Sequence, residues 1–153
     1  MNYEYHNPVL LKESVDALVT NPDGTYVDVT FGGGGHSKYI LSKLSAKGRL
    51  ISFDRDQDVL DRLPSDPRFT FVQHNFQFIK QFLTYGEFVP VDGILGDLGI
   101  SSHQIDVDNR GFAHRFDGPL DMRMDVNAKL SAQTVINDYS EEHILHIFNT
   151  YGE

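Results

Sequence analysis

Hydrophobic positions in the first hundred residues alternate between two kinds of spacing. Over residues 8–19 they recur every three or four positions, which predicts a helix. Residues 25–31 are dominated by β-branched and aromatic side chains, which predicts a strand. The alternation continues, with further helices predicted over 37–44, 57–63 and 77–84 and further strands over 49–53, 69–74 and 91–98. Strands that alternate with helices in this way favour an α/β fold, a parallel sheet with helices on both faces.

The pattern changes after residue 98. Residues 99–125 are rich in Gly, Asp, Arg and His and show no clear period. Segments of this length without secondary structure are usually functional or disordered when they occur inside a compact domain. Two short helical patterns follow, starting at Ser131 and at Ser140. The hydroxyl of Ser140 can accept a hydrogen bond from a free amide of the helix N-terminus.

Composition narrows the classes of protein to which the chain can belong. It has 13 Lys and Arg against 22 Asp and Glu, and the net charge of −9 counts against binding nucleic acid by general charge attraction, although a local basic patch is compatible with it. The absence of cysteine excludes disulfides, Cys-ligated zinc, iron–sulfur clusters and thiol catalysis. His143 and His146 lie three positions apart on a predicted helix without a third ligand in the pattern, so no metal site is predicted.

The sequence contains neither a predicted membrane span nor a secretory signal. No apolar run approaches the roughly 20 residues of a membrane helix. The first six residues lack the basic start and the apolar stretch of a signal peptide. We therefore expect a cytoplasmic protein with no membrane contact.

Four consecutive glycines, Gly32 to Gly35, follow the first predicted strand, and Asp54 ends the second. In parallel sheets of this kind ligands bind at the carboxyl ends of the strands, where glycines let backbone amides approach a ligand closely. Asp54 lies 22 positions after Gly32, near the spacing of an acid that accepts hydrogen bonds from a ribose. The loop and the acid together predict a nucleoside-containing cofactor. The alternative is a flexible turn followed by an aspartate that only caps the next helix.

The glycine loop matches neither common phosphate-binding pattern. The dinucleotide pattern G-x-G-x-x-G fails because its last position is Ser37 or Lys38, and the pattern G-x-x-x-x-G-K-[ST] is absent. A ligand without phosphates needs fewer amides but requires partners for an amino-acid group, which Asp28 and the loop turn can supply. S-adenosylmethionine fits this description better than NAD or ATP. A nucleotide-dependent oxidoreductase on the same type of sheet is the disfavoured alternative.

Several strings of the sequence resemble the RsmH (MraW) family. They are His-Asn-Pro-Val-Leu-Leu-Lys-Glu at 6–13, Asp-Val-Thr-Phe-Gly-Gly-Gly-Gly-His-Ser at 28–37, Asp-Leu-Gly-Ile-Ser-Ser-His-Gln at 97–104, Arg-Gly-Phe at 110–112 and Asp-Gly-Pro-Leu-Asp-Met-Arg-Met-Asp at 117–125. The resemblance covers residues 6–153, and the last string is very specific. It implies a Rossmann-like S-adenosylmethionine-dependent methyltransferase that modifies the exocyclic N4 of a cytosine in the decoding region of 16S ribosomal RNA.

The resemblance also implies roles for individual residues. Seven positions match residues that bind the cofactor in the family: Gly34, Gly35, His36, Asp54, Phe76, Asp97 and Gln104. By this resemblance the loop holds the methionine end of the cofactor, Asp54 the ribose, and Phe76 lines the adenine side.

Asp97 is also a candidate for the chemistry. The amino group of cytosine is a poor nucleophile, so an enzyme accelerates its methylation mainly by positioning it. Our hypothesis is that Asp97 orients or deprotonates this amine, and the alternative is that it only caps the turn after its strand.

Three arginines after the fourth strand are candidate RNA contacts, because arginine can pair with a phosphate or stack on a base. They are Arg110, Arg115 and Arg123. Neighbouring aspartates could instead hold all three within the protein. The partner implied by the resemblance is 16S ribosomal RNA or the small ribosomal subunit.

The resemblance also predicts the domain organisation. Residues 1–105 match the first part of the methyltransferase domain, and residues 106–153 match a loop and the start of a helical substrate-recognition insert. Family members continue well beyond this point. We therefore expect an incomplete sheet, whose open edge could support a homodimer, and a chain that is incomplete for catalysis. A non-catalytic cofactor- or RNA-binding fragment is the main alternative function.

Overall fold

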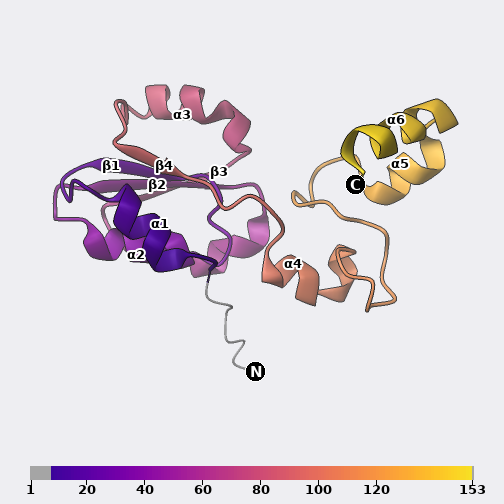
Figure 1. Ribbon diagram of the computed structural model, residues 1–153, viewed down its shortest axis with the longest axis horizontal. Coiled ribbons are helices and arrows are strands. Elements are labelled where there is room, and N and C mark those ends of the chain that lie inside the picture. The colour runs from indigo at the N-terminus through magenta and orange to yellow at the C-terminus, as the bar shows by residue number, and fades with distance from the viewer. Residues whose placement is uncertain (1–7, 153) are drawn as a thin grey trace. The chain divides into compact units, whose positions relative to one another are not determined.

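The computed structural model describes residues 8–152, and the chain divides into two compact units between Ser101 and Ser102. The first unit holds a four-stranded parallel sheet in the order β3-β2-β1-β4. Its strands are β1 (Thr25–Asp28), β2 (Arg49–Asp54), β3 (Phe69–Gln73) and β4 (Gly93–Leu95). Its helices are α1 (Leu11–Leu18), α2 (Gly35–Lys43) and α3 (Ile79–Tyr85), with the 3-10 turns η1 (Gln57–Arg62) and η2 (Phe76–Phe78). Helices α1 and α2 lie on one face of the sheet and α3 on the other (Figure 1), so the predicted α/β fold is confirmed.

Neighbouring residues of the two central strands face opposite sides of the sheet. Tyr26 and Leu50 belong to the hydrophobic cluster that α1 and α2 cover, whereas Val27 and Ile51 belong to the cluster that α3 covers. All four side chains are fully buried. Burial of an aliphatic side chain such as that of Val27, Leu50 or Ile51 stabilises a fold by roughly 1.5–3 kcal/mol relative to exposure. The two helical layers together therefore fix β1 and β2 as the centre of the sheet.

Two strands are shorter than predicted, and in each a side chain replaces one backbone partner. β1 ends at Asp28 rather than at residue 31, because the Thr30 amide donates a hydrogen bond to Asp28 Oδ1 (3.0 Å) in an Asx turn that interrupts the strand. The Phe31 amide still donates to the Phe53 carbonyl (3.0 Å). β4 spans only Gly93–Leu95 of the predicted 91–98, and the Asp97 amide donates to the Thr30 hydroxyl (2.8 Å) rather than to a strand. The predicted ends of both strands are therefore wrong.

The predicted helices of the first unit are present with shifted ends. α1 begins at Leu11 rather than at residue 8, and α2 begins at Gly35 rather than at residue 37. The helix predicted over 57–63 is the 3-10 turn η1, where Asp56 Oδ1 accepts a hydrogen bond from the Asp58 amide (3.1 Å). The helix predicted over 77–84 is η2 followed by α3.

The second unit consists of short helices joined by loops. It contains α4 (Ser102–Asp106), η3 (Asp108–Arg110), α5 (Ala132–Asp138) and α6 (Glu141–Tyr151). The sequence predicted neither α4 nor η3, because elements of five and three residues are too short to show a hydrophobic period. Helices α5 and α6 begin directly after Ser131 and Ser140, and the predicted N-cap at Ser140 is confirmed. Both serine hydroxyls accept hydrogen bonds from amides of the first turns (3.2 and 3.4 Å).

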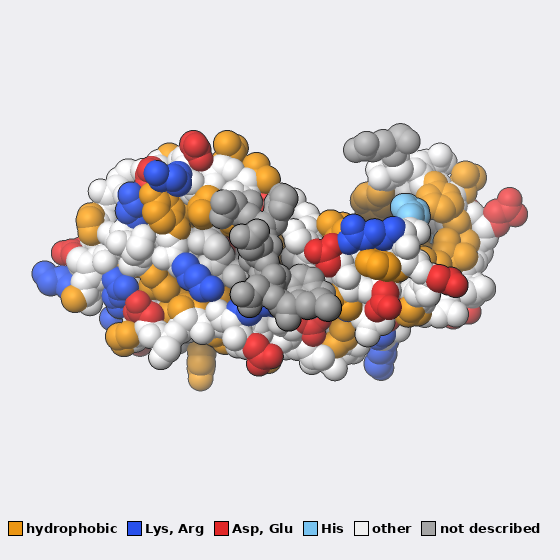
Figure 2. Space-filling view, turned by 90° about the horizontal axis from the view of Figure 1, so that it is seen from below, with side chains coloured by type: hydrophobic (Ala, Val, Ile, Leu, Met, Phe, Trp, Pro, Cys, Tyr) orange, Lys and Arg blue, Asp and Glu red, His pale blue; other side chains and the backbone are white. Residues whose placement is uncertain are grey.

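The surface carries charges of both signs. Acidic and basic side chains are interspersed among the described residues on the face seen in Figure 2. This distribution agrees with the net charge of −9. Among the helices described for residues 8–152, none is long and apolar enough to cross a membrane.

Arg68 ties the start of β3 to the end of α2. Its Nη1 donates hydrogen bonds to the carbonyls of Leu44 (2.6 Å) and Ser45 (3.2 Å), and its Nε and Nη2 donate to Asp66 (2.9 and 2.6 Å). The hydrogen bonds from Arg68 to Asp66 lower the pKa of the Asp66 carboxyl from 3.8 to about 2. A lowered pKa means that the pair stabilises the fold above about pH 4, where the unfolded carboxyl is also ionised, and that the contribution is lost as the pH falls through about 2.

The variant Asp66→Asn is therefore expected to have a lower thermal midpoint than the wild type at pH 7. The difference between the two midpoints should shrink as the pH falls from about 4 towards about 2, because the wild-type carboxyl then becomes protonated as well. Thermal unfolding across this pH range measures the effect, and Asp61→Asn, at an exposed position of η1, is the control. A midpoint difference that is constant over the whole range would contradict this account of the pair.

Candidate cofactor-binding site

The four glycines connect β1 to α2 at the carboxyl edge of the sheet. Gly32 (φ +50°) and Gly34 (φ +76°) have left-handed backbone conformations that residues with a Cβ rarely adopt. A Cβ at Gly34 would lie 2.8 Å from the Phe31 ring. At Gly32 the nearest atom to a Cβ would be the Thr30 carbonyl oxygen, at 3.9 Å. The loop is therefore tightly packed at Gly34 and open beside Gly32.

Asp54 ends β2 directly beside this loop. Its Oδ2 accepts a hydrogen bond from the Gly32 amide (2.8 Å), and its Oδ1 accepts one from the Asp56 amide (2.9 Å). Burial raises the pKa of the Asp54 carboxyl above its ordinary value, and the amide hydrogen bonds oppose that rise. The N-cap of η1 is Asp56, so the alternative in which Asp54 only caps the next helix is wrong. The glycine loop and Asp54, which the sequence predicts to act together, are in direct contact through the hydrogen bond from the Gly32 amide.

The first turn of α2 follows the loop without a side-chain cap. Its N-cap residue is Gly34, and the Lys38 amide donates to the Gly34 carbonyl (2.9 Å). His36 is buried in this turn, and Gly35 is packed against Pro8 so closely that a Cβ at this position would collide with the proline ring. Amides in the first turn of a helix can bind polar groups of a ligand, particularly anionic ones.

A buried polar network lies beneath the loop. Asp28 and Ser52 are register partners on β1 and β2, and both are fully buried. Ser37 of α2 donates to Asp28 Oδ2 (2.7 Å), and its Oγ lies 2.8 Å from Ser52 Oγ. Burial raises the pKa of the Asp28 carboxyl, and the hydrogen bond from Ser37 opposes this rise. The expectation that Asp28 binds the amino-acid group of a ligand directly is therefore wrong, because its side chain is enclosed by the protein.

Sequence reasoning missed the hydroxyl groups of this network. Ser37, Ser52 and Thr30 all bond to Asp28 or to one another. The available signal was the presence of small polar residues within apolar strand and helix patterns, at 28, 37 and 52. Such positions indicate a buried network when their hydrogen bonds are satisfied.

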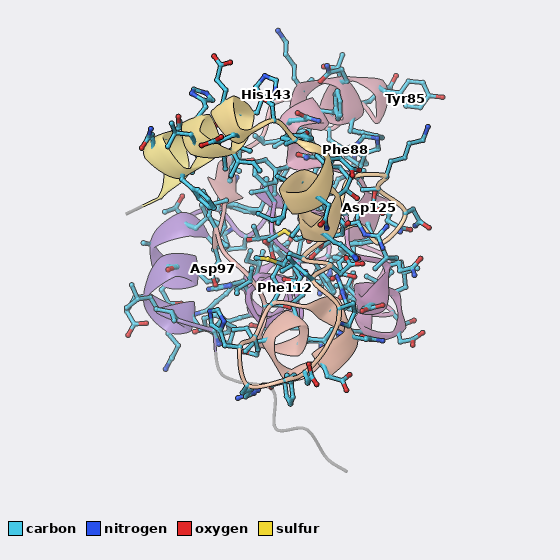
Figure 3. The ribbon with its side chains drawn as sticks, turned by 90° about the vertical axis from the view of Figure 1, so that its right-hand side faces the viewer. Tyr85, Phe88, Asp97, Phe112, Asp125 and His143 are labelled. Atoms are coloured by element: carbon cyan, nitrogen blue, oxygen red, sulfur yellow. The ribbon has the colours of Figure 1, made fainter. Side chains whose placement is uncertain are left out.

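Phe76 and Asp97 follow β3 and β4. Phe76 begins η2 and is 41% exposed. Asp97, labelled in Figure 3, lies exposed on the coil after β4. The carboxyl ends of parallel strands share one edge of a sheet, and the neighbouring strands β1 and β4 leave it at the point where the strand order reverses. This edge of the first unit brings together six of the seven predicted cofactor-binding residues: Gly34, Gly35, His36, Asp54, Phe76 and Asp97.

Gln104, the seventh predicted residue, belongs to the second unit. It lies on α4 and is buried, with only 5% of its surface exposed. Its cofactor-binding role stays a prediction.

Arg110 and Arg123 are engaged by the protein itself. Arg110 is 5% exposed, and its Nη2 donates to the carbonyls of Arg123 (2.9 Å) and Met124 (3.2 Å). Arg123 donates to Asp121 through Nε (2.9 Å) and Nη2 (2.6 Å), and its Nη1 donates to the carbonyls of residues 126 and 128. These contacts favour a structural role for both arginines, which close the loop between η3 and α5.

Arg115 is the most exposed of the three arginines. Its side chain is 57% exposed, forms an ion pair with Asp106 and lies over the Phe116 ring, 4.8 Å from the ring centroid. A planar guanidinium beside an exposed aromatic ring is an arrangement on which a base can stack.

Within residues 8–152, no group of three His, Cys, Asp or Glu side chains could hold a metal ion. His143 is exposed on α6 (Figure 3), and its ring contacts Tyr139 at a centroid distance of 6.1 Å.

The sheet order, the glycine loop after β1 and the acid that ends β2 are those of a Rossmann-like methyltransferase domain. The sequence matches the MraW methylase family over residues 3–153, and the chain belongs to that family. The resemblance found in the sequence is thereby confirmed.

Curated relatives carry the name ribosomal RNA small subunit methyltransferase H. The chain is 57% identical over 149 residues to the protein of Bacteroides fragilis, 55% identical over 150 residues to that of Christiangramia forsetii, and 52% identical over 150 residues to that of Parabacteroides distasonis. These matches cover 97–98% of this chain and 49–50% of each relative. The chain therefore spans about half the length of the curated relatives it matches.

Proposed function

We propose that the chain is the cofactor-binding part of an enzyme that transfers a methyl group from S-adenosylmethionine to the exocyclic N4 of a cytosine in the decoding region of 16S ribosomal RNA. The observation that carries the proposal is the 2.8 Å hydrogen bond from the Gly32 amide to Asp54, which joins the glycine loop to the acid that would hold the ribose. The names of the relatives, which are methyltransferases of the ribosomal RNA small subunit, support the same substrate class.

The residues at the carboxyl edge of the sheet fit S-adenosylmethionine. Beside Gly32 the loop is open, since a Cβ there would meet nothing nearer than 3.9 Å. The partly exposed carboxylate of Asp54 can accept hydrogen bonds from ribose hydroxyls. The exposed ring of Phe76 offers an apolar surface to adenine, and the uncapped amides at the start of α2 can bind the methionine carboxylate.

The chemistry proposed for this site depends mainly on positioning. S-adenosylmethionine supplies an electrophilic methyl group on its sulfonium. The lone pair of the cytosine amine is delocalised into the ring, so the amine must be held in line with the methyl group. Asp97 would accept a hydrogen bond from the amine and take the proton that leaves N4. The carbon–nitrogen bond would form as the bond between the methyl carbon and the sulfonium breaks, with S-adenosylhomocysteine as the leaving group. The target base must first leave its stack, because its Watson–Crick edge is otherwise out of reach.

Transfer of labelled methyl groups to small ribosomal subunits tests this function. The variant Asp97→Asn is expected to lose transfer by a much larger factor than it loses affinity for S-adenosylmethionine, because an amide cannot accept the proton. A fall in affinity as large as the fall in transfer would mean that Asp97 serves only to bind the cofactor. Cofactor binding without transfer by the unmodified chain would favour the second candidate, a non-catalytic cofactor-binding chain.

Arg115 is the proposed RNA contact of the second unit. Removing a side chain on which a base stacks typically costs about 1–3 kcal/mol, so Arg115→Ala is expected to weaken binding of a single-stranded decoding-region RNA by roughly five- to a hundredfold. Fluorescence anisotropy at one fixed salt concentration measures the change. The matched control is Lys47→Ala, which removes a cation that is 82% exposed in the first unit. Equal losses of affinity in the two variants would mean that Arg115 contributes only its positive charge and that no base stacks on it.

A further inference from the structure

Thr30 joins the residue that follows β4 to the buried network beneath the glycine loop. The Asp97 amide donates a hydrogen bond to Thr30 Oγ1 (2.8 Å), and Thr30 Oγ1 donates to Asp28 Oδ1 (3.4 Å). The Thr30 amide donates to the same carboxylate oxygen (3.0 Å). A hydroxyl carries one proton and two lone pairs, so this hydroxyl is used as an acceptor on one side and as a donor on the other.

The other end of the network reaches α2 and β2. Asp28 Oδ2 accepts a hydrogen bond from Ser37 Oγ (2.7 Å), which in turn lies 2.8 Å from Ser52 Oγ. All three residues are fully buried. Ser37 lies in the first turn of α2, directly after the glycine loop. A buried network whose members are all hydrogen-bonded favours one arrangement, so Asp28 fixes the start of α2 relative to β1.

We propose that Thr30 is a positioning residue, whose hydroxyl holds the backbone of Asp97 in a fixed place relative to the glycine loop. The last backbone bond between β1 and β4 runs from the Val29 amide to the Leu95 carbonyl (2.9 Å). The segment after β4 then leaves the sheet, and the Asp97 amide donates to the Thr30 hydroxyl in place of a backbone carbonyl of a neighbouring strand. The importance of this link for methyl transfer rests on the function proposed above for Asp97.

The position of Thr30 explains why a single hydroxyl can matter for transfer. Thr30 follows β1 and contacts the segment that follows β4. The strand order reverses between these two strands, and ligands bind at such a point in open parallel sheets. On one side the network holds the loop proposed to bind the methyl donor, and on the other it holds the residue proposed to bind the acceptor amine. A displacement of about 1 Å between reacting groups can reduce a rate by roughly a hundredfold.

Two substitutions at one position test the proposal. Thr30→Val keeps the branched shape of the side chain and removes the hydroxyl, whereas Thr30→Ser keeps the hydroxyl and removes the methyl group. Hydrogen exchange of the Asp97 amide, measured by NMR, reads the link directly. We expect exchange to accelerate by about three- to tenfold in Thr30→Val and to stay at the wild-type rate in Thr30→Ser. The Val29 amide, which donates to the Leu95 carbonyl through a backbone hydrogen bond that neither substitution removes, is the internal control.

Unchanged exchange of the Asp97 amide in Thr30→Val would overturn the proposal, whatever the activity of the protein. If this variant does not fold, Thr30→Ala compared with Thr30→Ser provides the same test. In the transfer reaction we expect kcat to fall by roughly tenfold in Thr30→Val, with a smaller change in the KM for S-adenosylmethionine, and to recover in Thr30→Ser. Faster exchange with an unchanged kcat would overturn the claim that the link between Thr30 and Asp97 matters for methyl transfer. If the wild type neither binds S-adenosylmethionine nor transfers a methyl group, the proposed function fails, while hydrogen exchange still decides whether Thr30 holds Asp97.

Discussion

Replacing Asp54 with alanine is expected to lower the affinity for S-adenosylmethionine by roughly a hundredfold or more. A carboxylate can accept hydrogen bonds from both hydroxyls of a ribose, and each hydrogen bond to a charged group contributes about 1.5–3 kcal/mol. The substitution also removes the partner of the Gly32 amide, which Asp54 holds at 2.8 Å. Isothermal titration calorimetry measures the change. The matched control is Asp61→Ala, which removes an exposed carboxylate from η1 and should leave the affinity unchanged.

Removing the charge of Asp54 should not lower the stability of the fold, although it lowers the affinity for the cofactor. Because burial raises the pKa of this carboxyl in the folded state, the folded protein binds its proton more readily than the unfolded chain does. Its contribution to stability therefore falls as the pH rises through the range just above 3.8. Asp54→Asn keeps an acceptor for the Gly32 amide and removes the charge. At pH 7 this variant is expected to be at least as stable as the wild type while it binds the cofactor more weakly.

This combination separates a binding role from a structural one. A variant that loses affinity because it unfolds would lose stability as well. If Asp54→Ala binds S-adenosylmethionine as tightly as the wild type, the assignment of Asp54 to the ribose is wrong. The affinity of the wild type should also decline as the pH is lowered through the raised pKa of Asp54, because the protonated carboxyl is a poorer acceptor.

Gly34→Ala is expected to lower the free energy of unfolding by about 2–5 kcal/mol. A left-handed backbone costs a residue with a Cβ about 1–2 kcal/mol, and the new Cβ would lie 2.8 Å from the Phe31 ring. Overpacking of that kind typically costs a further 1–3 kcal/mol or so. Urea unfolding of the two proteins measures the difference.

The control for Gly34→Ala is available two residues earlier in the same loop. Gly32 has the same class of backbone conformation (φ +50°), but a Cβ there would meet no atom within 3.9 Å. Gly32→Ala should therefore incur only the backbone cost of about 1–2 kcal/mol. Equal losses of stability at the two positions would mean that the contact with Phe31 has no energetic weight.

The sequence predicted the order of the elements in the first unit because each strand there is a short apolar run between turn residues. The ends of β1 and β4 could not be predicted. They depend on the Thr30 hydroxyl, which accepts from the Asp97 amide, and on the Asp28 carboxylate, which accepts from the Thr30 amide. A hydrogen bond between residues 67 positions apart leaves no trace in a local hydrophobic pattern. The five-residue helix α4 was missed for a related reason, since it is shorter than two helical turns.

The candidate site was predictable where spacing alone carries the information. The distance along the chain between Gly32 and Asp54 reflects the combined length of helix α2 and strand β2, and the structure joins the two residues by a hydrogen bond. Burial was not predictable in the same way. The sequence could not distinguish Arg115, which is 57% exposed on its side chain, from Arg110, which is 5% exposed, because this difference depends on how the loop folds over itself.

The central claim is that the glycine loop and Asp54 bind S-adenosylmethionine, and a calorimetric titration of the wild-type chain tests it most directly. Parallel titrations with S-adenosylmethionine and with NAD are compared, and thermal unfolding is followed at the same ligand concentrations. The account predicts binding of S-adenosylmethionine alone, with a stabilisation of about 2.7 kcal/mol at roughly a hundredfold excess over the dissociation constant. Binding of NAD in its place, or no response to S-adenosylmethionine, would contradict the account.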